Sequence, residues 1–222
     1  MLIKLSDIEL RVLACLIEKE ITTPDYYPLS LNSLTAACNQ KSNREPEMKV
    51  DDKAVVQALD HLRYEHHIVW HVTVPGSRVP KYKHDIQSRW KFSAQELAIL
   101  CELMLRGPQT VGELRTHGER LYKFTGLDEV EGALQELIGR PEGAFVAKLP
   151  REPGRKEPRF AHLFAGDVAV PNEASEPPPE PARLELMADN EHFLRLESEI
   201  ASLRSEIDSI KAQFAEFKKQ FE

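Results

Sequence analysis

Apolar residues follow a helical pattern in two stretches that begin alike, Ser6–Glu20 and Ala94–Arg106. In each stretch they recur at spacings of three and four, which is typical of an amphipathic helix. A serine precedes or opens each stretch, and a glutamate follows it three positions later, so the two side chains can satisfy the first free amides of the helix. The pattern therefore predicts two equivalent amphipathic helices.

A second matched pair of segments indicates an internal repeat. Pro75–His84 parallels Pro153–His162, and most positions agree in identity or in residue type. The helix match and this match occur in the same order along the chain, which chance explains poorly. We therefore predict that one structural unit occurs twice.

Each copy is predicted to contain three helices followed by two strands. The first copy has helices at residues 6–20, 30–38 and 52–65 and strands at 67–74 and 80–85. The second has helices at 94–106, 111–118 and 128–138 and strands at 144–149 and 159–163. Three helices closed by a β-hairpin are typical of the winged helix, a variant of the helix-turn-helix. We predict an α+β, mainly helical fold with two tandem winged-helix domains, residues 1–89 and 90–165.

The last quarter of the chain differs from both copies. Residues 166–183 are rich in proline and acidic residues, which favours an extended linker. In residues 184–222 apolar positions alternate at spacings of three and four, as in a coiled-coil helix. A parallel homodimer would bury its seam, which comprises Phe193, Leu196, Ile200, Leu203, Ile207, Ile210, Phe214 and Phe217. The alternative is a helix that folds back on the chain's own domains.

Charge is distributed unevenly along the chain. The formal net charge is −7, from 29 Lys and Arg against 36 Asp and Glu, and the whole acidic excess lies in residues 166–222. A dedicated nucleic-acid-binding protein usually has a basic excess, because neutralising phosphates supplies much of its affinity. Any basic surface on residues 1–165 must therefore be local.

Membrane and disulfide-rich classes do not fit this sequence. The longest apolar run, Val12–Ile17, is far shorter than the roughly 20 residues of a spanning helix. The first residues lack the pattern of a secretory signal. The three cysteines, Cys15, Cys38 and Cys101, show no CxxC spacing, which favours reduced thiols. These features predict a cytoplasmic protein.

The segment Asn32–Pro46 resembles the YceH family of uncharacterised bacterial proteins. Further matching stretches are Thr22–Pro24, Tyr27–Ser30, Leu105–Gly107, Gly112–Arg115, Arg151–Gly154 and His162–Phe164. The resemblance covers residues 1 to about 165 and implies a tandem winged-helix fold. It implies no established reaction or ligand, so it assigns no catalytic residues.

The sharpest functional hypothesis is binding of double-stranded DNA by the first copy. In a helix-turn-helix the third helix enters the major groove, while the wing and the preceding loop hold phosphates. Basic and amide side chains expected at that surface are Lys41, Asn43, Arg44, Lys53, Gln57, Arg78, Lys81 and Lys83. Here Gln57 and Asn43 would read adenine edges and Arg44 a guanine. Arg155 and Lys156 of the second wing would add phosphate contacts.

Other observations oppose this hypothesis. Asp51, Asp52 and Asp60 lie on or beside the predicted third helix, where they would repel phosphate. The corresponding helix of the second copy is acidic, which favours a packing or protein-contacting role. For the loop at residues 39–46, an ordinary turn-forming role remains as open as a binding role.

The sequence contains no catalytic signature. We find no Gly-rich phosphate loop, nucleophile elbow or zinc-protease motif. His61, His66, His67 and His71 have no cysteine or carboxylate nearby at metal-site spacing, so we interpret them as ordinary surface or half-buried histidines. We predict a non-enzymatic protein without cofactor or metal. DNA binding by a homodimer, including a regulatory role, is the first hypothesis; a protein-interaction scaffold that uses winged helices as docking surfaces is the alternative.

Overall fold

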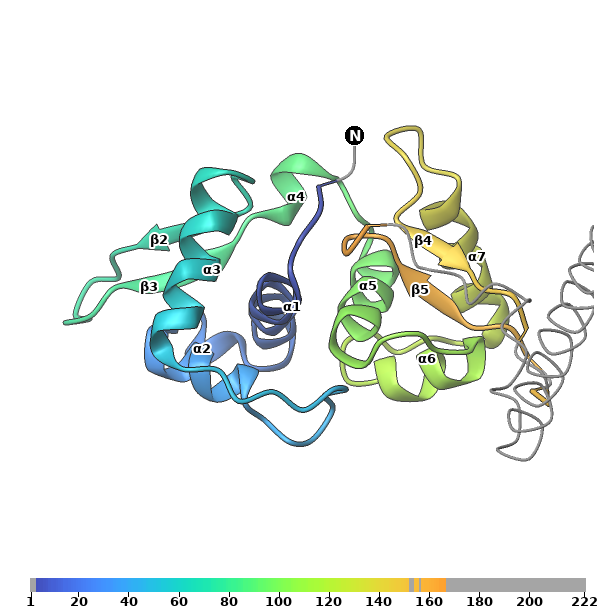
Figure 1. Ribbon diagram of the computed structural model, residues 1–222, viewed down its shortest axis with the longest axis horizontal. Helices are drawn as coiled ribbons and strands as arrows, with labels where there is room; N and C mark the ends of the chain where they lie inside the picture. The colour runs from blue at the N-terminus through green and yellow to red at the C-terminus, as the bar shows by residue number, and fades with distance from the viewer. Residues whose placement is uncertain (1–2, 152–153, 156, 167–222) are drawn as a thin grey trace, which may run out of the picture. The chain divides into compact units, whose positions relative to one another are not determined.

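The computed structural model describes residues 3–151, 154–155 and 157–166, which all fall in one compact unit, Met1–Val170. Within these residues the protein is α+β, with seven α-helices and two small antiparallel sheets (Figure 1). Lys156, the linker beyond Gly166 and the predicted coiled-coil helix with its eight interface positions lie outside them. None of the described helices has both the length and the apolar character that a membrane span requires.

The first copy forms three helices and a three-stranded sheet. Its elements are α1 (Asp7–Thr22), the 3-10 turn η1 (Pro24–Tyr26), β1 (Leu29–Ser30), α2 (Leu31–Cys38), α3 (Asp52–Tyr64), β2 (Val69–Val72) and β3 (Lys81–His84). The strand order is β1-β3-β2, so β3 is central. Polar side chains define the helix starts, because Ser6, Ser30 and Asp51 each accept a hydrogen bond from a first-turn amide of the helix that follows.

The second copy repeats this arrangement with a smaller sheet. After the short connecting helix α4 (Ile86–Arg89) come α5 (Ala94–Arg106), α6 (Val111–Gly118), α7 (Leu127–Ile138), β4 (Val146–Lys148) and β5 (Phe160–His162). Ser93 and Thr110 cap α5 and α6, each with a reciprocal bond from the glutamate three residues later. The predicted order of elements is therefore the order in the structure.

Equivalent positions in the two copies have equivalent surroundings. Helix α3 buries Val55, Ala58, Leu59 and Leu62, and α7 buries residues at the same spacing, namely Val130, Ala133, Leu134 and Leu137. Gly76 and Gly154 both have a φ of +82°, which favours glycine at the turn of each hairpin. Leu29 pairs with Tyr82 as Gln109 pairs with Phe160. These correspondences support the predicted repeat.

Helices α1 and α5 lie side by side at the centre of the described chain (Figure 1). Each buries ten consecutive residues, Glu9–Glu18 and Glu96–Leu105. The thiol of Cys101 donates to the carbonyl oxygen of Ala14 at 3.4 Å across this contact. The prediction that these helices are amphipathic, with one apolar face, is therefore wrong. Each helix packs against its own copy on one side and against the other copy on the other, so both copies share one hydrophobic core.

Candidate nucleic-acid interface

The outer face of α3 is polar and exposed. Lys53, Gln57 and Asp60 follow one another at spacings of four and three, so they share the face opposite the buried Val55 and Leu59. Two of the predicted DNA-contacting residues, Lys53 and Gln57, are thus brought together on one accessible surface. Asp60 lies on the same surface.

The acidic residues at the start of α3 have local structural roles. The carboxylate of Asp51 accepts a hydrogen bond from the Ala54 amide at 2.8 Å and caps the helix. The hydroxyl of Thr35 donates to Asp52 at 2.6 Å, which ties α2 to α3. Helix capping and the α2–α3 contact therefore account for both carboxylates, independently of any partner.

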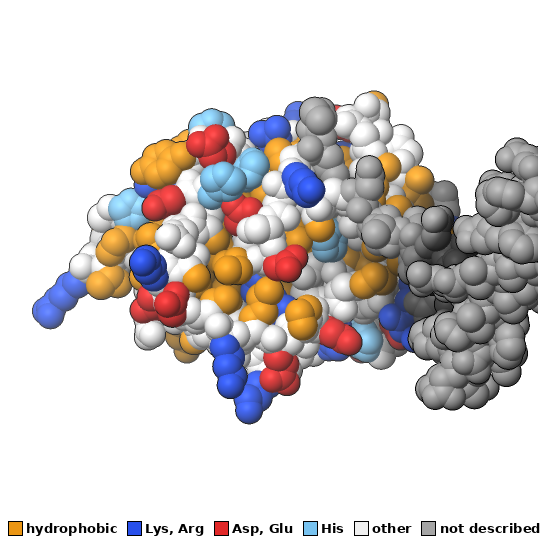
Figure 2. All heavy atoms as spheres, in the orientation of Figure 1, with side chains coloured by type: hydrophobic (Ala, Val, Ile, Leu, Met, Phe, Trp, Pro, Cys, Tyr) orange, Lys and Arg blue, Asp and Glu red, His pale blue; other side chains and the backbone are white. Residues whose placement is uncertain are grey.

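The β2–β3 hairpin carries the basic side chains that the sequence predicts for the first wing. Lys81 and Lys83 alternate with Tyr82 along β3, so both face the same side of the sheet. On that side Lys83 is paired with the exposed Trp70 and Lys81 with Val72. The hairpin projects from the first copy, and basic side chains reach its outer end (Figures 1 and 2). Arg78 is exposed in the connection between the strands.

Arg44 is not available to DNA. Its side chain is fully buried, and it donates to the Glu18 carboxylate at 2.6 Å and to the Ala37 carbonyl at 3.1 Å. The prediction that Arg44 reads a guanine is therefore wrong, because burial and these partners occupy its guanidinium. Asn43 is half-buried with a φ of +57°, and its side-chain oxygen accepts from Arg106 of the second copy. Of the three predicted loop contacts, only Lys41 is exposed.

The loop that contains Arg44 joins the two copies. The Glu45 amide donates to the Leu105 carbonyl of α5 at 2.8 Å. Arg120, which follows α6, forms ion pairs with Glu18 of α1 and, at 2.6 Å, with Glu102 of α5. We call these charged residues, the buried Glu18, Arg44 and Glu102 and the half-buried Arg120, the junction network. For Asn43 and Arg44 the structural role of the loop is therefore supported over a binding role.

Electrostatics in the junction network differ between its two carboxylates. Burial opposes ionisation of Glu18, but the hydrogen bonds and charges of Arg44 and Arg120 outweigh it and lower its pKa to about 2. Burial dominates at Glu102 and raises its pKa despite the contact with Arg120. Sequence reasoning missed both carboxylates; the available signal was a glutamate inside an otherwise apolar helix.

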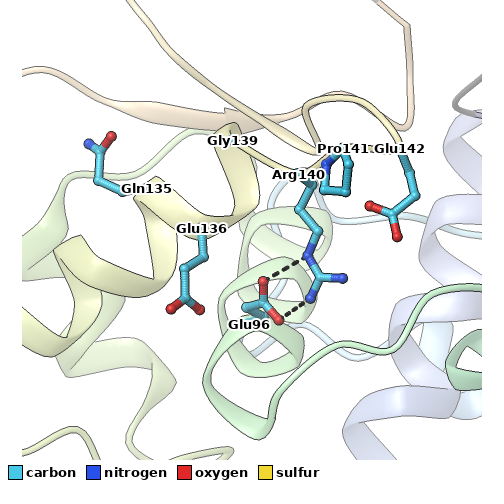
Figure 3. A pocket seen from close by; sticks show the side chains of 7 residues that line it. All are labelled: Glu96, Gln135, Glu136, Gly139, Arg140, Pro141 and Glu142. Carbon is cyan, nitrogen blue, oxygen red and sulfur yellow. Dashed lines mark hydrogen bonds and ion pairs between the residues drawn. The ribbon is translucent and has the colours of Figure 1, made fainter.

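Helix α7, the counterpart of α3 in the second copy, carries no basic residue. The outer face of α7 carries Asp128, Glu131 and Glu136, all exposed. At its carboxyl end a cavity of about 610 Å³ contains Arg140, whose guanidinium points to Glu96 and donates to it at 3.0 Å (Figure 3). That cation is already paired with a carboxylate. Arg155 is exposed in the second hairpin.

Comparisons with known proteins point to a single family. A family described as "Protein of unknown function, DUF480" matches residues 5–155. A UPF0502 protein of Geobacter sulfurreducens is 54% identical over 220 residues, which cover 99% of each chain. Another UPF0502 protein, from Geotalea uraniireducens, is 52% identical over 89% of each chain. One from Vibrio atlanticus is 47% identical over 90% of this chain and 92% of its own. None of these names states an activity.

Proposed function

The chain belongs to the uncharacterised DUF480 family, whose members are also named UPF0502, and on that premise we propose that it is a DNA-binding protein with two tandem winged-helix units. YceH proteins are members of the same family, so the resemblance identified from the sequence is confirmed. Because the family has no established activity, the proposal rests on the residues of this chain.

The observation that carries the proposal is the shared orientation of Lys81 and Lys83. Both lie on the outward side of β3. Arg78 lies in the exposed turn of the same hairpin. The carboxylate of Asp85 at the base of the hairpin accepts hydrogen bonds from Trp70 and Ser88, at 2.8 and 2.6 Å. A projecting hairpin with an excess of basic residues fits the phosphate-holding role of a wing.

The proposed division between the copies follows from their outer helices. Helix α3 would enter the major groove and present Gln57 to base edges, with Lys53 beside it. Helix α7 exposes carboxylates and would stay away from phosphate. The second copy then supports the first through the junction network, and Arg155 would add a phosphate contact from the second wing.

Removing the two wing lysines is expected to weaken DNA binding and its salt dependence together. Each phosphate contact contributes about 0.9 to the slope of log affinity against log salt. The double variant Lys81→Ala/Lys83→Ala should therefore reduce that slope by about 2. Fluorescence anisotropy with a mixed-sequence duplex, measured at about 50 and 200 mM salt, provides both quantities.

A matched control for this titration is Lys123→Ala. Lys123 is exposed in the second copy, between α6 and α7, away from the first wing. The Lys123→Ala variant should bind DNA as the unchanged protein does. A loss of affinity per removed lysine as large in Lys123→Ala as in the double variant would show that only net charge matters. No binding by the unchanged protein at low salt would refute DNA binding and leave the alternative.

The alternative is a protein-interaction scaffold, and one surface of the second copy favours it. A groove of about 460 Å³ lies between α6, α7 and β5. Its lining combines apolar groups, including Leu127, which is 47% exposed, with the carboxylates of Glu131 and Glu157 and one cation, Lys148. A groove of mixed lining in which carboxylates outnumber cations suits a basic, apolar peptide better than a phosphate backbone.

The proposed assembly is a homodimer held by the carboxyl-terminal helix. Deleting residues 184–222 is expected to convert a dimer to a monomer, since those residues contain the whole predicted apolar seam. DNA affinity should fall with the mass, because two linked sites bind more tightly than one. Light scattering of both proteins measures the change.

A point variant separates loss of the seam from loss of chain length. Ile200→Asp places a charge in the predicted seam, whereas Ser205→Asp places one on the predicted outward face. The first should dissociate the dimer and the second should not. If the protein remains a dimer both after the deletion and after Ile200→Asp, the coiled-coil interface is contradicted.

A further inference from the structure

Three side chains that are far apart in the sequence meet where α3 ends against the start of α1. They are Glu9 of α1, His61 in the last turn of α3, and His66 just after α3. One ligand-type atom from each lies within 4.8 Å of the other two. The Nδ1 atom of His61 is hydrogen-bonded to Oε1 of Glu9. The two imidazole rings meet edge to face, with centroids 5.2 Å apart.

The carboxylate of Glu9 is held in position by the start of its own helix. Its Oε2 atom accepts hydrogen bonds from the Ser6 amide at 2.7 Å and from the Ser6 hydroxyl at 2.8 Å. Burial opposes its ionisation, but these two bonds and His61 outweigh burial and keep its pKa below the usual value. The buried group is therefore an anion with one oxygen fixed and the other facing the histidines.

His66 is the member of the cluster that lacks a partner. Its Nε2 atom is buried and, within the described chain, makes no hydrogen bond. A buried polar atom without a partner is uncommon and calls for an explanation. Burial also lowers the pKa of His66 although Glu9 is close, which disfavours the imidazolium form.

The second copy shows what this place in the fold accommodates. The equivalent capping glutamate, Glu96, pairs with the guanidinium of Arg140 just beyond α7. There a permanent cation links the start of the first helix to the end of the third. The first copy has the glutamate but two imidazoles in place of the arginine. The cationic link is therefore missing from this copy unless a histidine is protonated or a cation binds.

We propose that Glu9, His61 and His66 form a binding site for a divalent transition-metal ion, with zinc as the best fit. Two imidazole nitrogens and one carboxylate oxygen are a common zinc donor set, with water as the fourth ligand. Nitrogen donors disfavour magnesium and calcium, which prefer oxygen. Bonds of about 2.0–2.2 Å require ligand atoms roughly 3.4 Å apart. The three ligand-type atoms lie within 4.8 Å of one another, so rotation of the exposed His61 side chain would bring them to the required separation. The ion would tie the end of α3 to α1, as Arg140 ties α7 to α5.

Metal titration of the full-length chain without a purification tag tests this site directly. We expect calorimetry to show one Zn²⁺ bound per chain. One Co²⁺ should bind with the visible absorption of a four-coordinate ion, and added Zn²⁺ should displace it. His61→Gln and His66→Gln should each weaken Zn²⁺ binding by about 100-fold or more, since even changing a residue that only hydrogen-bonds to a metal ligand costs about 10–100-fold. Zn²⁺ should also raise the melting temperature of the unchanged protein but not of these variants.

His71→Gln is the matched control, because His71 is exposed on β2 and lies outside the cluster. It should bind Zn²⁺ as the unchanged protein does. The His61 and His66 variants keep the Ser6–Glu9 capping bonds, so their melting temperatures without metal show whether they fold. No stoichiometric binding by the unchanged protein, or cluster variants that bind Zn²⁺ as tightly as the unchanged protein, would overturn the proposal and leave a simple Glu9–His61 hydrogen bond.

Discussion

Replacing Arg44 with alanine is expected to lower the free energy of unfolding by about 3–5 kcal/mol, the usual cost of removing one partner from a buried ion pair. The carboxylate of Glu18 is 1% exposed, so loss of Arg44 leaves its charge inside the protein with Arg120 as its remaining arginine partner. The carbonyl of Ala37 also loses the Arg44 guanidinium as a donor. Urea unfolding at pH 7, followed by circular dichroism, measures the change.

Two controls define what the Arg44→Ala result means. Lys41→Ala changes an exposed residue of the same loop and should shift stability by no more than about 0.5 kcal/mol. Arg44→Lys keeps the charge but loses the planar fork that reaches several acceptors, so an intermediate loss is expected. If Arg44→Ala costs no more than Lys41→Ala, the buried Arg44–Glu18 pair does not stabilise the fold.

Stability is expected to fall by about 2–3 kcal/mol as the pH is lowered from about 6.5 to 4, because of His162. Burial lowers the pKa of this histidine to about 4, and Asp7, the charged group that acts on it, only partly opposes the shift. In the unfolded chain its pKa is about 6.5. The unfolded state therefore binds the proton first as the pH falls, so the stabilisation is full above pH 6.5 and is lost toward pH 4.

Denaturant unfolding of His162→Gln across this pH range tests the assignment. Glutamine does not titrate, so the variant should have a flatter stability profile than the unchanged protein between pH 6.5 and 4. The carboxylate of Glu18 affects stability at lower pH. Because its pKa is depressed to about 2 in the folded protein, most of its stabilising contribution is lost between about pH 4.5 and 2. His71→Gln should retain the original profile. Parallel profiles for His162→Gln and the unchanged protein would show that another group is responsible.

The helices of this fold are predictable because their signals are local. Helices α5 and α6 begin and end where the pattern predicts, since Ser93 and Thr110 mark their starts by capping the first amides. The spacing of buried residues in α3 and α7 follows from helical geometry alone. Both hairpins were predicted from their Pro-Gly turns, although the strands are shorter than expected.

Features that depend on tertiary contacts could not be predicted from local patterns. Strand β1 has two residues and exists because it pairs with β3, and α4 has four. Neither element is long enough for its apolar residues to show a helical or strand periodicity. The burial of α1 on all sides arises from α5, and the apolar run Val12–Ile17 was the only local sign of it.

The candidate sites illustrate the same limit. The exposed positions of Lys53, Gln57 and Lys83 agree with what helix and strand periodicity predict. Arg44 was misassigned because its partner Glu18 lies 26 positions earlier. Glu9 was missed as a neighbour of His61 because 52 positions separate them. Residue type and spacing give the chemistry that is available, but the partner is chosen by the packing of whole helices.

The central pairing of α1 and α5 has a consequence for how such a protein diverges. Each half packs against the other through buried residues of α1 and α5. Neither outward helix, α3 or α7, is therefore needed to keep the halves joined. By the register of their buried residues, Lys53 of α3 corresponds to Asp128 of α7. A doubled ancestor could therefore preserve its symmetry inside while its two outer faces acquired different charges.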